Sequence, residues 1–294
     1  MKTSVVIVGR NDNYGGTLNE RATACLNTMC DAFDEVIFVD WDTEEGKPPL
    51  TKVLKIDVNP ERLKTIIVRP QMVEKIMGGT KPPNGFCEVI PRNIGLRRAS
   101  GDYIVLANLD IIGPRRFELL YAIRKLRENE LITSKRNHID IKVVYEVYNQ
   151  TKSWPVTRDY MFDYYGVSSI NSTRLSPFLS INKQILDQVP NEHKFGAVSL
   201  IDGCGDFQIA HRDLWYKIRG CEEDQIKRNC MDTEIQYKVI MAGGTVTASN
   251  SPPVYHIDHP RYFDADSKFH NKNELYETRN TEKWGHPDEV FETF

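Results

Sequence analysis

Short apolar runs alternate with amphipathic segments along the first part of the chain. The apolar runs lie at 4–8, 35–40, 64–69 and 103–108. The spacing of apolar and polar residues between them indicates helices at 17–33, 71–77 and 92–101. This strand and helix alternation predicts an α/β fold, with a mixed, mainly parallel sheet flanked by helices in a single domain.

The fourth run, within GDYIVLANLDIIGP at 101–114, leads directly into polar residues. Asn108 and Asp110 follow the apolar stretch before Gly113 and Pro114 interrupt it. Ligands of such sheets bind at the carboxyl ends of the strands. Residues two apart on a strand share a face, so Asn108 and Asp110 are expected to offer oxygen ligands to a hard cation together. The alternative is a turn in which Asp110 bonds backbone amides.

Further elements are predicted after Pro114. A helix with one apolar face is indicated at 115–129, and MDTEIQYKVIMAGG at 231–244 favours a helix that ends at glycine. KVVYEVY at 142–148 and SPFLSI at 176–181 favour strands. The tail at 261–294 carries seven large aromatic residues among its charges, so we expect it to pack on the domain.

Composition and charge exclude several classes of protein. The 294 residues are 40% hydrophobic and 27% charged, with a net charge of -3. No dense basic block is present, so nucleic acid is not an expected partner. No apolar stretch approaches the roughly 20 residues of a transmembrane segment. The six cysteines contain no C-x-x-C pair, which argues against a zinc knuckle. We expect a cytoplasmic protein that is soluble or peripheral to a membrane.

The segment PRNIGLRRASGDYIVLANLD resembles a run in the GT-A glycosyltransferases, particularly their inverting, family 2-like branch. In that family the run R-N-x-G…A-x-G-x-Y-I-x-x-x-D-x-D ends in acidic residues that hold a divalent metal on a nucleotide-sugar diphosphate. The resemblance implies Mn²⁺ or Mg²⁺ on Asp110. Asn108 replaces the first aspartate, and its carbonyl oxygen can still be a ligand. Leu109 lies between them, and Arg92 is a candidate contact to the diphosphate or the donor sugar.

Two earlier segments resemble the nucleotide-binding end of the same family. VVIVGRNDNYGG is similar to its first strand and loop, and VIFVDWDTEEG to its second strand with an acidic end. The resemblance implies that the base and ribose are contacted by Val8, Arg10, Asn11, Asp12, Tyr14, Asp40 and Asp42. Each aspartate taken alone also fits a turn or a helix cap. Three such ends on adjacent strands favour a binding edge.

The segment GCGDFQIAHRDLWYKIRGCEED, with the helix that follows it, resembles the catalytic part of the family. Asp232 matches the second acidic residue of an E-D motif, and Met231 stands where glutamate is frequent. The resemblance implies that Asp232 is the general base that takes the proton of the acceptor hydroxyl. Asp206 is a second catalytic candidate that could orient hydroxyl groups, and Glu234 is in reserve. The alternative for Asp232 is a helix cap.

The segment VYHIDHP places His256, Asp258 and His259 close together. It resembles the late histidine that completes the metal site in GT-A enzymes, and His256 is the favoured ligand. Strand alternation would put His256 and Asp258 on one face and His259 on the other, although Pro260 suggests that the strand has ended. A packed or surface histidine is the alternative reading.

Together, these resemblances predict a GT-A, Rossmann-like domain over 1–260, with a nucleotide-sugar half at 1–114 and an acceptor and catalytic half at 115–260. The implied enzyme is a hexosyl- or pentosyltransferase. We expect it to transfer a sugar from a UDP-sugar to a glycan or another hydroxyl-bearing acceptor, with inversion of the anomeric centre. Two alternatives remain: a non-catalytic protein that binds nucleotide-sugars or glycans, and a sugar-1-phosphate nucleotidyltransferase, whose glycine-rich phosphate loop is not seen.

Overall fold

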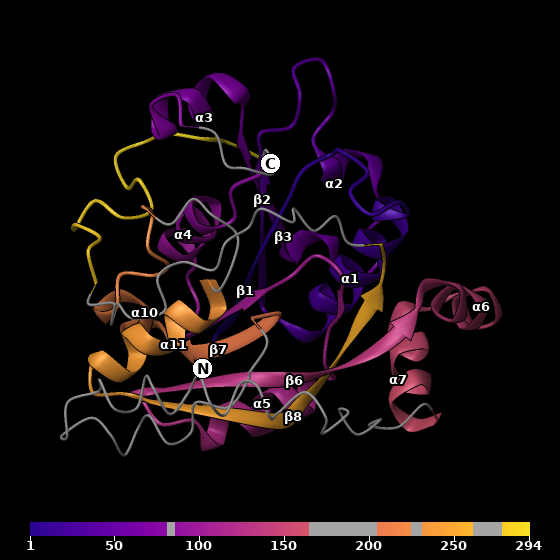
Figure 1. Ribbon diagram of the computed structural model, residues 1–294. Coiled ribbons are helices and arrows are strands. Elements are labelled where there is room, and N and C mark those ends of the chain that lie inside the picture. The colour runs from indigo at the N-terminus through magenta and orange to yellow at the C-terminus, as the bar shows by residue number, and fades with distance from the viewer. Residues whose placement is uncertain (81–85, 165–204, 225–230, 261–277) are drawn as a thin grey trace.

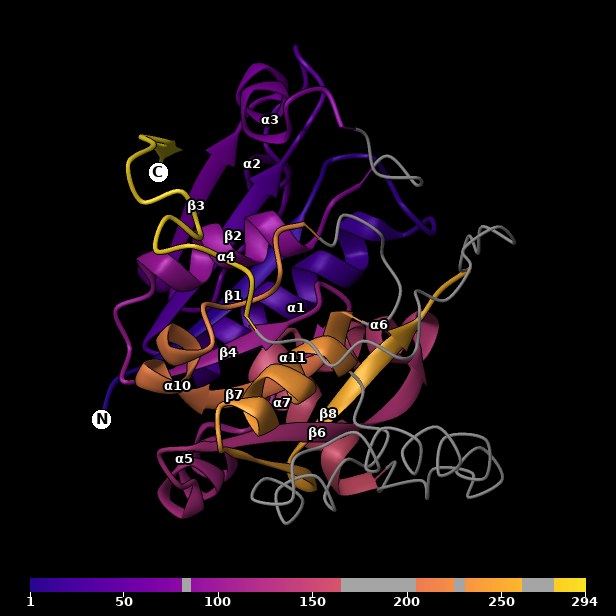
Figure 2. The same ribbon diagram turned by 60° about the vertical axis from the view of Figure 1, so that its left-hand side comes forward.

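The computed structural model describes residues 1–80, 86–164, 205–224, 231–260 and 278–294. Nine strands of this described part form one mixed sheet in the order β5-β8-β6-β7-β4-β1-β2-β3-β9 (Figures 1 and 2). Its longest pairings are parallel, and helices cover both faces. The predicted α/β fold class is therefore confirmed. The predicted strand at 176–181 lies outside the described residues.

The nucleotide-binding half of the prediction corresponds to four parallel strands. These are β1 (Thr3–Gly9), β2 (Glu35–Trp41), β3 (Leu63–Val68) and β4 (Tyr103–Ala107). Their connections contain α1 (Leu18–Ala32), α2 (Leu50–Val53), a 3₁₀ turn (Pro60–Arg62), α3 (Pro70–Met77) and α4 (Val89–Arg98). Because the strands are parallel, the loops after β1, β2 and β4 meet at one edge of the sheet.

The second half adds strands of both directions. These are β5 (Ile111–Ile112), β6 (Glu130–Asp140), β7 (Phe207–His211) and β8 (Thr245–Asp258). Its helices are α5 (Arg116–Lys125), α6 (Ile141–Thr151), α7 (Trp154–Tyr164), α10 (Arg212–Lys217) and α11 (Met231–Met241). β7 is antiparallel to β4 and β6, and β8 is parallel to β6 but antiparallel to β5.

The alternating side chains of β1 feed two separate cores. Val6 packs into a core shared with α4, α10 and α11, whereas Val5 and Ile7 pack into a core shared with α1 and α5. A third, smaller core lies under α6 and α7, which Figure 1 shows together at one end of the molecule. The two main cores hold the central strands rigidly, so the loops at their carboxyl ends have a firm base.

The prediction of a strand at 142–148 is wrong. The segment lies in α6, where Val144 and Val147 are buried on one face and the Asp140 carboxylate accepts a hydrogen bond from the Lys142 amide at 2.7 Å as the cap. Valine and tyrosine favour strands by propensity, but packing against α7 overrides that preference here. The predicted helix at 115–129 is also shorter in the structure, and β6 starts at Glu130.

The last described segment, 278–294, packs against α4 and β3. Its strand β9 (Glu292–Thr293) pairs with β3, and Trp284 is buried in the core shared with α4. Arg98 donates hydrogen bonds to the backbone carbonyls of Gly285, His286 and Glu289. The remainder of the predicted tail, 261–277, lies outside the described residues. No helix among those described is long and apolar enough to cross a bilayer.

Candidate functional site

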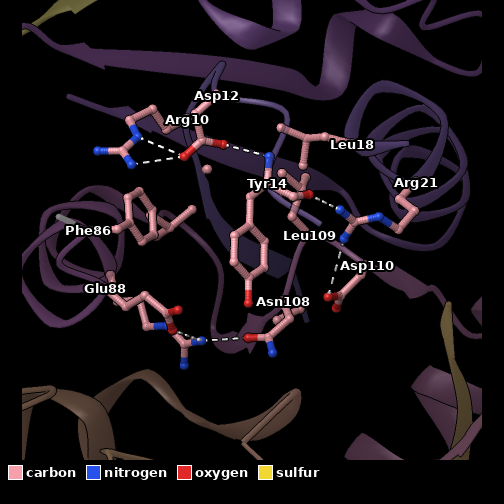
Figure 3. A pocket seen from close by; sticks show the side chains of 14 residues that line it. Arg10, Asp12, Tyr14, Leu18, Arg21, Phe86, Glu88, Asn108, Leu109 and Asp110 are labelled. Atoms are coloured by element: carbon pink, nitrogen blue, oxygen red, sulfur yellow. Dashed lines mark hydrogen bonds and ion pairs between the residues drawn. The ribbon is translucent and has the colours of Figure 1, made fainter. Parts of the chain in front are cut away.

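A pocket opens at the carboxyl ends of β1 and β4 (Figure 3). It is open to solvent and is lined by charged, polar and apolar side chains. The walls come from β1 and its loop, the start of α1, the residues before α4, and the end of β4. They comprise Val8, Gly9, Arg10, Asp12, Tyr14, Leu18, Arg21, Phe86, Glu88, Arg92, Ala107, Asn108, Leu109 and Asp110. Seven of the ten residues predicted to contact the nucleotide-sugar therefore line one cavity.

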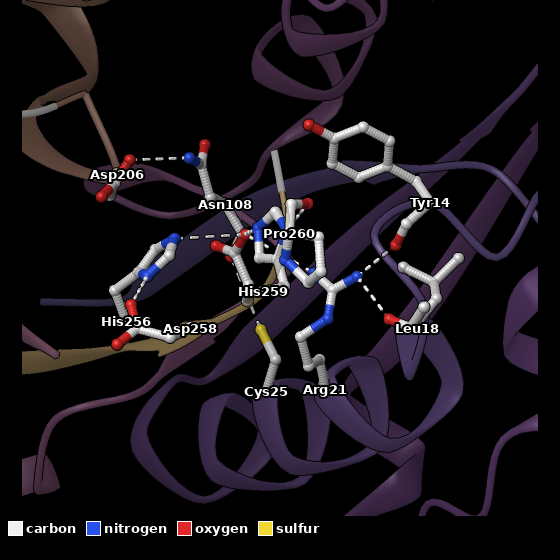
Figure 4. A network of polar contacts seen from close by, with 12 residues as sticks. Tyr14, Leu18, Arg21, Cys25, Asn108, Asp206, His256, Asp258, His259 and Pro260 are labelled. Carbon is white, nitrogen blue, oxygen red and sulfur yellow. Dashed lines mark hydrogen bonds and ion pairs between the residues drawn. The ribbon is translucent and has the colours of Figure 1, made fainter. Parts of the chain in front are cut away.

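Two histidines converge on Asp110, which lines this pocket. Figure 4 shows these histidines, His256 and His259. The Asp110 Oδ2 atom lies 2.9 Å from His259 Nε2 and 3.5 Å from His256 Nε2. The pairing of β5 with β8 places Ile111 opposite His256, which brings the neighbouring Asp110 to the same point. Of the two alternatives for His259, the structure fits the one in which the strand has ended, because β8 ends at Asp258 and both histidines reach Asp110.

The electrostatics of this cluster fit a bound cation. Burial opposes the charge on Asp110, but hydrogen bonds from His256 and His259 outweigh it and hold the pKa of this carboxyl well below its usual range. The Asp110 Oδ1 atom is buried and has no hydrogen-bond partner. One carboxylate and two imidazoles whose donor atoms all lie within 4.8 Å form a donor set suited to a divalent ion.

Asn108 has different partners from Asp110, although both residues line the pocket. Its Oδ1 atom accepts a hydrogen bond from Arg92 Nη2 at 2.6 Å, and its Nδ2 atom donates to Asp206 Oδ1 at 2.7 Å. β4 ends at Ala107, so strand alternation no longer relates Asn108 to Asp110. Asparagine supplies both an acceptor and a donor, which an aspartate could not do in its ionised form.

Arg92 enters the pocket from α4 as a nearly buried cation, with 4% of its surface exposed. Besides Asn108 it contacts the Glu88 carboxylate at 3.3 Å, but its Nη1 atom is buried without a hydrogen-bond partner. An unused guanidinium nitrogen in a cavity wall is suited to an anionic ligand.

The loop after β1 places Arg10, Asp12 and Tyr14 around the part of the pocket that is uppermost in Figure 3, which we call the upper pocket. Arg10 pairs with Asp12 at 2.9 Å, and its guanidinium lies 5.2 Å from the centre of the Phe86 ring. The Tyr14 ring meets the His259 ring edge to face at 5.5 Å between centres. The pocket and the Asp110 cluster are therefore in direct contact.

Three predicted nucleotide contacts do not line this pocket. Asp40 is fully buried and accepts a hydrogen bond from the Leu50 amide at 2.6 Å, so the turn alternative describes its contacts. Burial raises the pKa of Asp40. The Asn11 amide group donates to the Pro48 carbonyl at 3.0 Å, and Asp42 lies 3.4 Å from Arg10 Nη1. These residues hold the loop that follows β2 against the loop that follows β1.

The catalytic candidates lie beside the Asn108 end of the pocket. Asp206 is 6% exposed and forms an ion pair with Arg136 as well as its bond from Asn108. Asp232, in the first turn of α11, accepts a hydrogen bond from the Gly205 amide at 3.0 Å. Glu234 points elsewhere, toward Arg279 at 3.6 Å, and burial raises its pKa to about 7.

Sequence reasoning missed one residue of the site above all. Arg21 is only 2% exposed, lies 3.7 Å from Asp110 Oδ2, and donates to the backbone carbonyls of Tyr14 and Gly16. The sequence could have indicated its burial, because Arg21 lies on the same face of α1 as the buried residues Leu18 and Cys25. A charge at an apolar position signals a buried partner.

Of the comparisons with known proteins, only the one with solved structures found matches. No protein-family model matches the chain, and no curated protein matches it in sequence. Among solved structures, GalNAc-T7 with UDP, GalNAc and Mn²⁺ superposes with a TM-score of 0.50 at 11% identity, over 88% of this chain and 44% of that one. The mannosyltransferase PcManGT from Pyrobaculum calidifontis, in complex with GDP-Man and Mn²⁺, gives 0.48 at 16% identity over 88% and 56%. S. aureus TarS 1-349 gives 0.48 at 15% identity over 87% and 60%.

GalNAc-T7 is similar to this chain in fold. The chain spans about half the length of the proteins it matches. The match to GalNAc-T7 confirms the GT-A type of α/β fold that the motifs predicted.

Proposed function

We propose that this chain is a metal-assisted glycosyltransferase that uses a nucleotide-sugar donor. The observation that carries the proposal is the junction of the pocket with the cluster of Asp110, His256 and His259 at the carboxyl edge of a GT-A sheet. Neither part alone would distinguish a transferase from a binding protein, but a cation site that adjoins a pocket lined by Arg10 and Arg92 suits a diphosphate-linked ligand.

Asp110, His256 and His259 would hold Mn²⁺ or Mg²⁺. The two imidazoles favour Mn²⁺, since Mg²⁺ prefers an all-oxygen shell. When bound, the ion would offset the charge that develops on the leaving nucleoside diphosphate. Arg92 adds to this with its unpartnered Nη1 atom, which faces no other acceptor among the described residues. Two cationic contributions therefore meet the diphosphate from different walls.

The base and ribose of the donor are assigned to the upper pocket. Arg10, Asp12 and Tyr14 supply hydrogen-bonding groups there, and Phe86 supplies an apolar wall. A UDP-sugar is the proposed donor, with a glycan or another hydroxyl-bearing molecule as acceptor.

Asp232 is proposed as the general base. Its contact with Gly205 puts it next to Asp206, whose carbonyl accepts a hydrogen bond from the Asn108 amide at 3.0 Å. The carboxylate would take the acceptor proton during attack opposite the leaving group, which inverts the anomeric centre. Asp206 is engaged with Arg136 and Asn108, so it is better suited to orienting hydroxyl groups than to accepting the proton.

The test is a thermal-shift screen with UDP-, GDP- and dTDP-sugars, with and without Mn²⁺, followed by assays for released nucleoside diphosphate. A UDP-sugar with Mn²⁺ should raise the melting temperature of the wild type, and Asp110→Ala should abolish that shift. Asp213→Ala is the matched control, because Asp213 is 82% exposed and remote from the pocket.

Asp232→Asn separates binding from catalysis. It should keep the donor-induced thermal shift while kcat falls by roughly 10²- to 10⁴-fold. Near-normal turnover would remove Asp232 from the mechanism. Donor binding without any turnover in the wild type would favour a binding protein, and release of pyrophosphate would favour a nucleotidyltransferase.

A further inference from the structure

His256 has two ring nitrogens, and the proposed cation site uses only one of them. Nε2 faces Asp110, whereas Nδ1 is buried and has no hydrogen bond with any described residue. Buried polar atoms without a partner are rare and call for an explanation. The carboxylate of Asp258 lies 3.4 Å from this Nδ1 atom (Figure 4).

The sheet itself places Asp258 there. His138 on β6 is the register partner of His256 on β8, so their side chains emerge on the same face. Asp258 lies two residues beyond His256 and shares that face. Its Oδ1 atom is 2.7 Å from His138 Nδ1, and the rings of His138 and His256 are 5.2 Å apart. Asp258 is thus held between two imidazoles.

We propose that Asp258 and His138 are positioning residues for His256, an inference that rests on the proposed function. A neutral imidazole that binds a cation through Nε2 carries its proton on Nδ1. Asp258 accepts that proton in a hydrogen bond and so fixes both the tautomer and the orientation of the ring. His138 in turn holds the Asp258 carboxylate, whose side chain is 57% exposed.

The same three residues could instead hold an ion of their own, because their donor atoms lie within 4.8 Å of one another. An ion held by His138, His256 and Asp258 would bind the unprotonated Nδ1 of His256. The ring proton would then lie on Nε2, facing Asp110, so His256 could not also bind an ion in the cluster of Asp110, His256 and His259. Burial favours this cluster: the side chains of Asp110 and His259 are 14% and 4% exposed, against 48% for His138. Water competes least for the ion at the buried position.

The experiment measures Mn²⁺ binding to the nucleotide-free protein by the electron paramagnetic resonance signal of free Mn²⁺. Asp258→Ala should weaken binding about 10- to 100-fold, the usual effect of removing an outer partner of a metal ligand. His138→Ala should weaken it less, and the exposed control Asp213→Ala should bind as wild type does. The Mn²⁺ concentration that gives half-maximal transfer should rise in parallel, while kcat at saturating Mn²⁺ stays near the wild-type value.

Each result has a definite meaning. Loss of melting temperature in metal-free Asp258→Ala with unchanged Mn²⁺ affinity would mark a structural role and overturn the inference. Should that variant not fold, Asp258→Asn keeps the size of the side chain but is a weaker acceptor, and it too must bind Mn²⁺ less tightly.

Asp110→Ala, measured alongside, separates this inference from the proposed function. If the wild type binds no Mn²⁺, the proposed function is itself overturned. If Asp110→Ala loses binding while Asp258→Ala keeps it, only the positioning role is overturned. Two ions on the wild type, one of them retained by Asp110→Ala, would show that His138, His256 and Asp258 form a separate ion site.

Discussion

Glu234 should make the stability of this protein fall as the pH rises from acid to neutral. The side chain is 6% exposed, and one of its oxygens has no hydrogen bond. Burial first, and then the negative charge of Glu222, raise its pKa from 4.5 to about 7. Lys238 and Arg279 counteract this rise, and Asp224 adds to it. Between about pH 4.5 and 7, the folded chain therefore keeps a proton that the unfolded chain releases.

The sign and size of the effect follow by linkage. A raised carboxyl pKa gives stability that is fully present below about pH 4.5 and is lost as the pH rises through about 7. The gap between the two values corresponds to about 3 kcal/mol, at about 1.4 kcal/mol for each pH unit. Glu234→Gln keeps the size of the side chain and removes the charge. It should match the wild type near pH 5 and exceed it by up to about 3 kcal/mol at pH 8.

Urea unfolding, followed by tryptophan fluorescence at several values between pH 5 and pH 8, measures the difference. Other titrating groups are common to both proteins, so the difference between the two unfolding free energies isolates Glu234. Glu128→Gln is the control, because Glu128 is exposed and should change nothing at any pH. A difference between Glu234→Gln and wild type that stays constant across this range would refute the reasoning.

Three further substitutions, with Gly16→Ala as a control for Gly15→Ala, test the site network. Asn108→Asp replaces a hydrogen-bond donor by a carboxylate oxygen at the 2.7 Å contact with Asp206, so the unfolding free energy should fall by about 1–3 kcal/mol. A melting temperature at or above that of the wild type would contradict the role of Asn108 in linking Arg92 to Asp206. Gly15→Ala and Gly16→Ala both place alanine at positive φ, at a cost of about 1–2 kcal/mol. Only the new Cβ at Gly15 would approach His259 Nδ1, to 2.6 Å, so Gly15→Ala alone should also weaken Mn²⁺ binding, and equal Mn²⁺ affinities in a titration would argue against His259 as a ligand.

Local sequence patterns were sufficient for the central sheet and for the edge of the sheet at which the pocket lies. The four parallel strands are short apolar runs that are buried between two helical layers. Such runs can be recognised in the sequence without knowing which strands pair with them. The polar residues at the end of β4 mark the carboxyl edge of the sheet, where the structure places the pocket. The family resemblance added the expectation of a cation at Asp110.

Other features depend on contacts between distant segments. β6 is rich in polar residues, and it is a strand because β7 and β8 pair with it on either side. The residues at 142–148 have strand propensity, yet packing against α7 makes them a helix. Asp40 resembles a ligand-binding aspartate in sequence, but the Leu50 amide engages it in the interior.

The composition of the Asp110 cluster was likewise decided by tertiary structure. His256 reaches Asp110 because β5 and β8 pair, and His259 joins them because the chain leaves β8 after Asp258. Arg21 approaches the same carboxylate from α1. Hydrophobic periodicity records which face of an element is buried, but it holds no information on which distant side chain will meet that face. Which side chains meet is set by strand pairing and by the burial of charge, and both depend on segments that are far apart in the sequence.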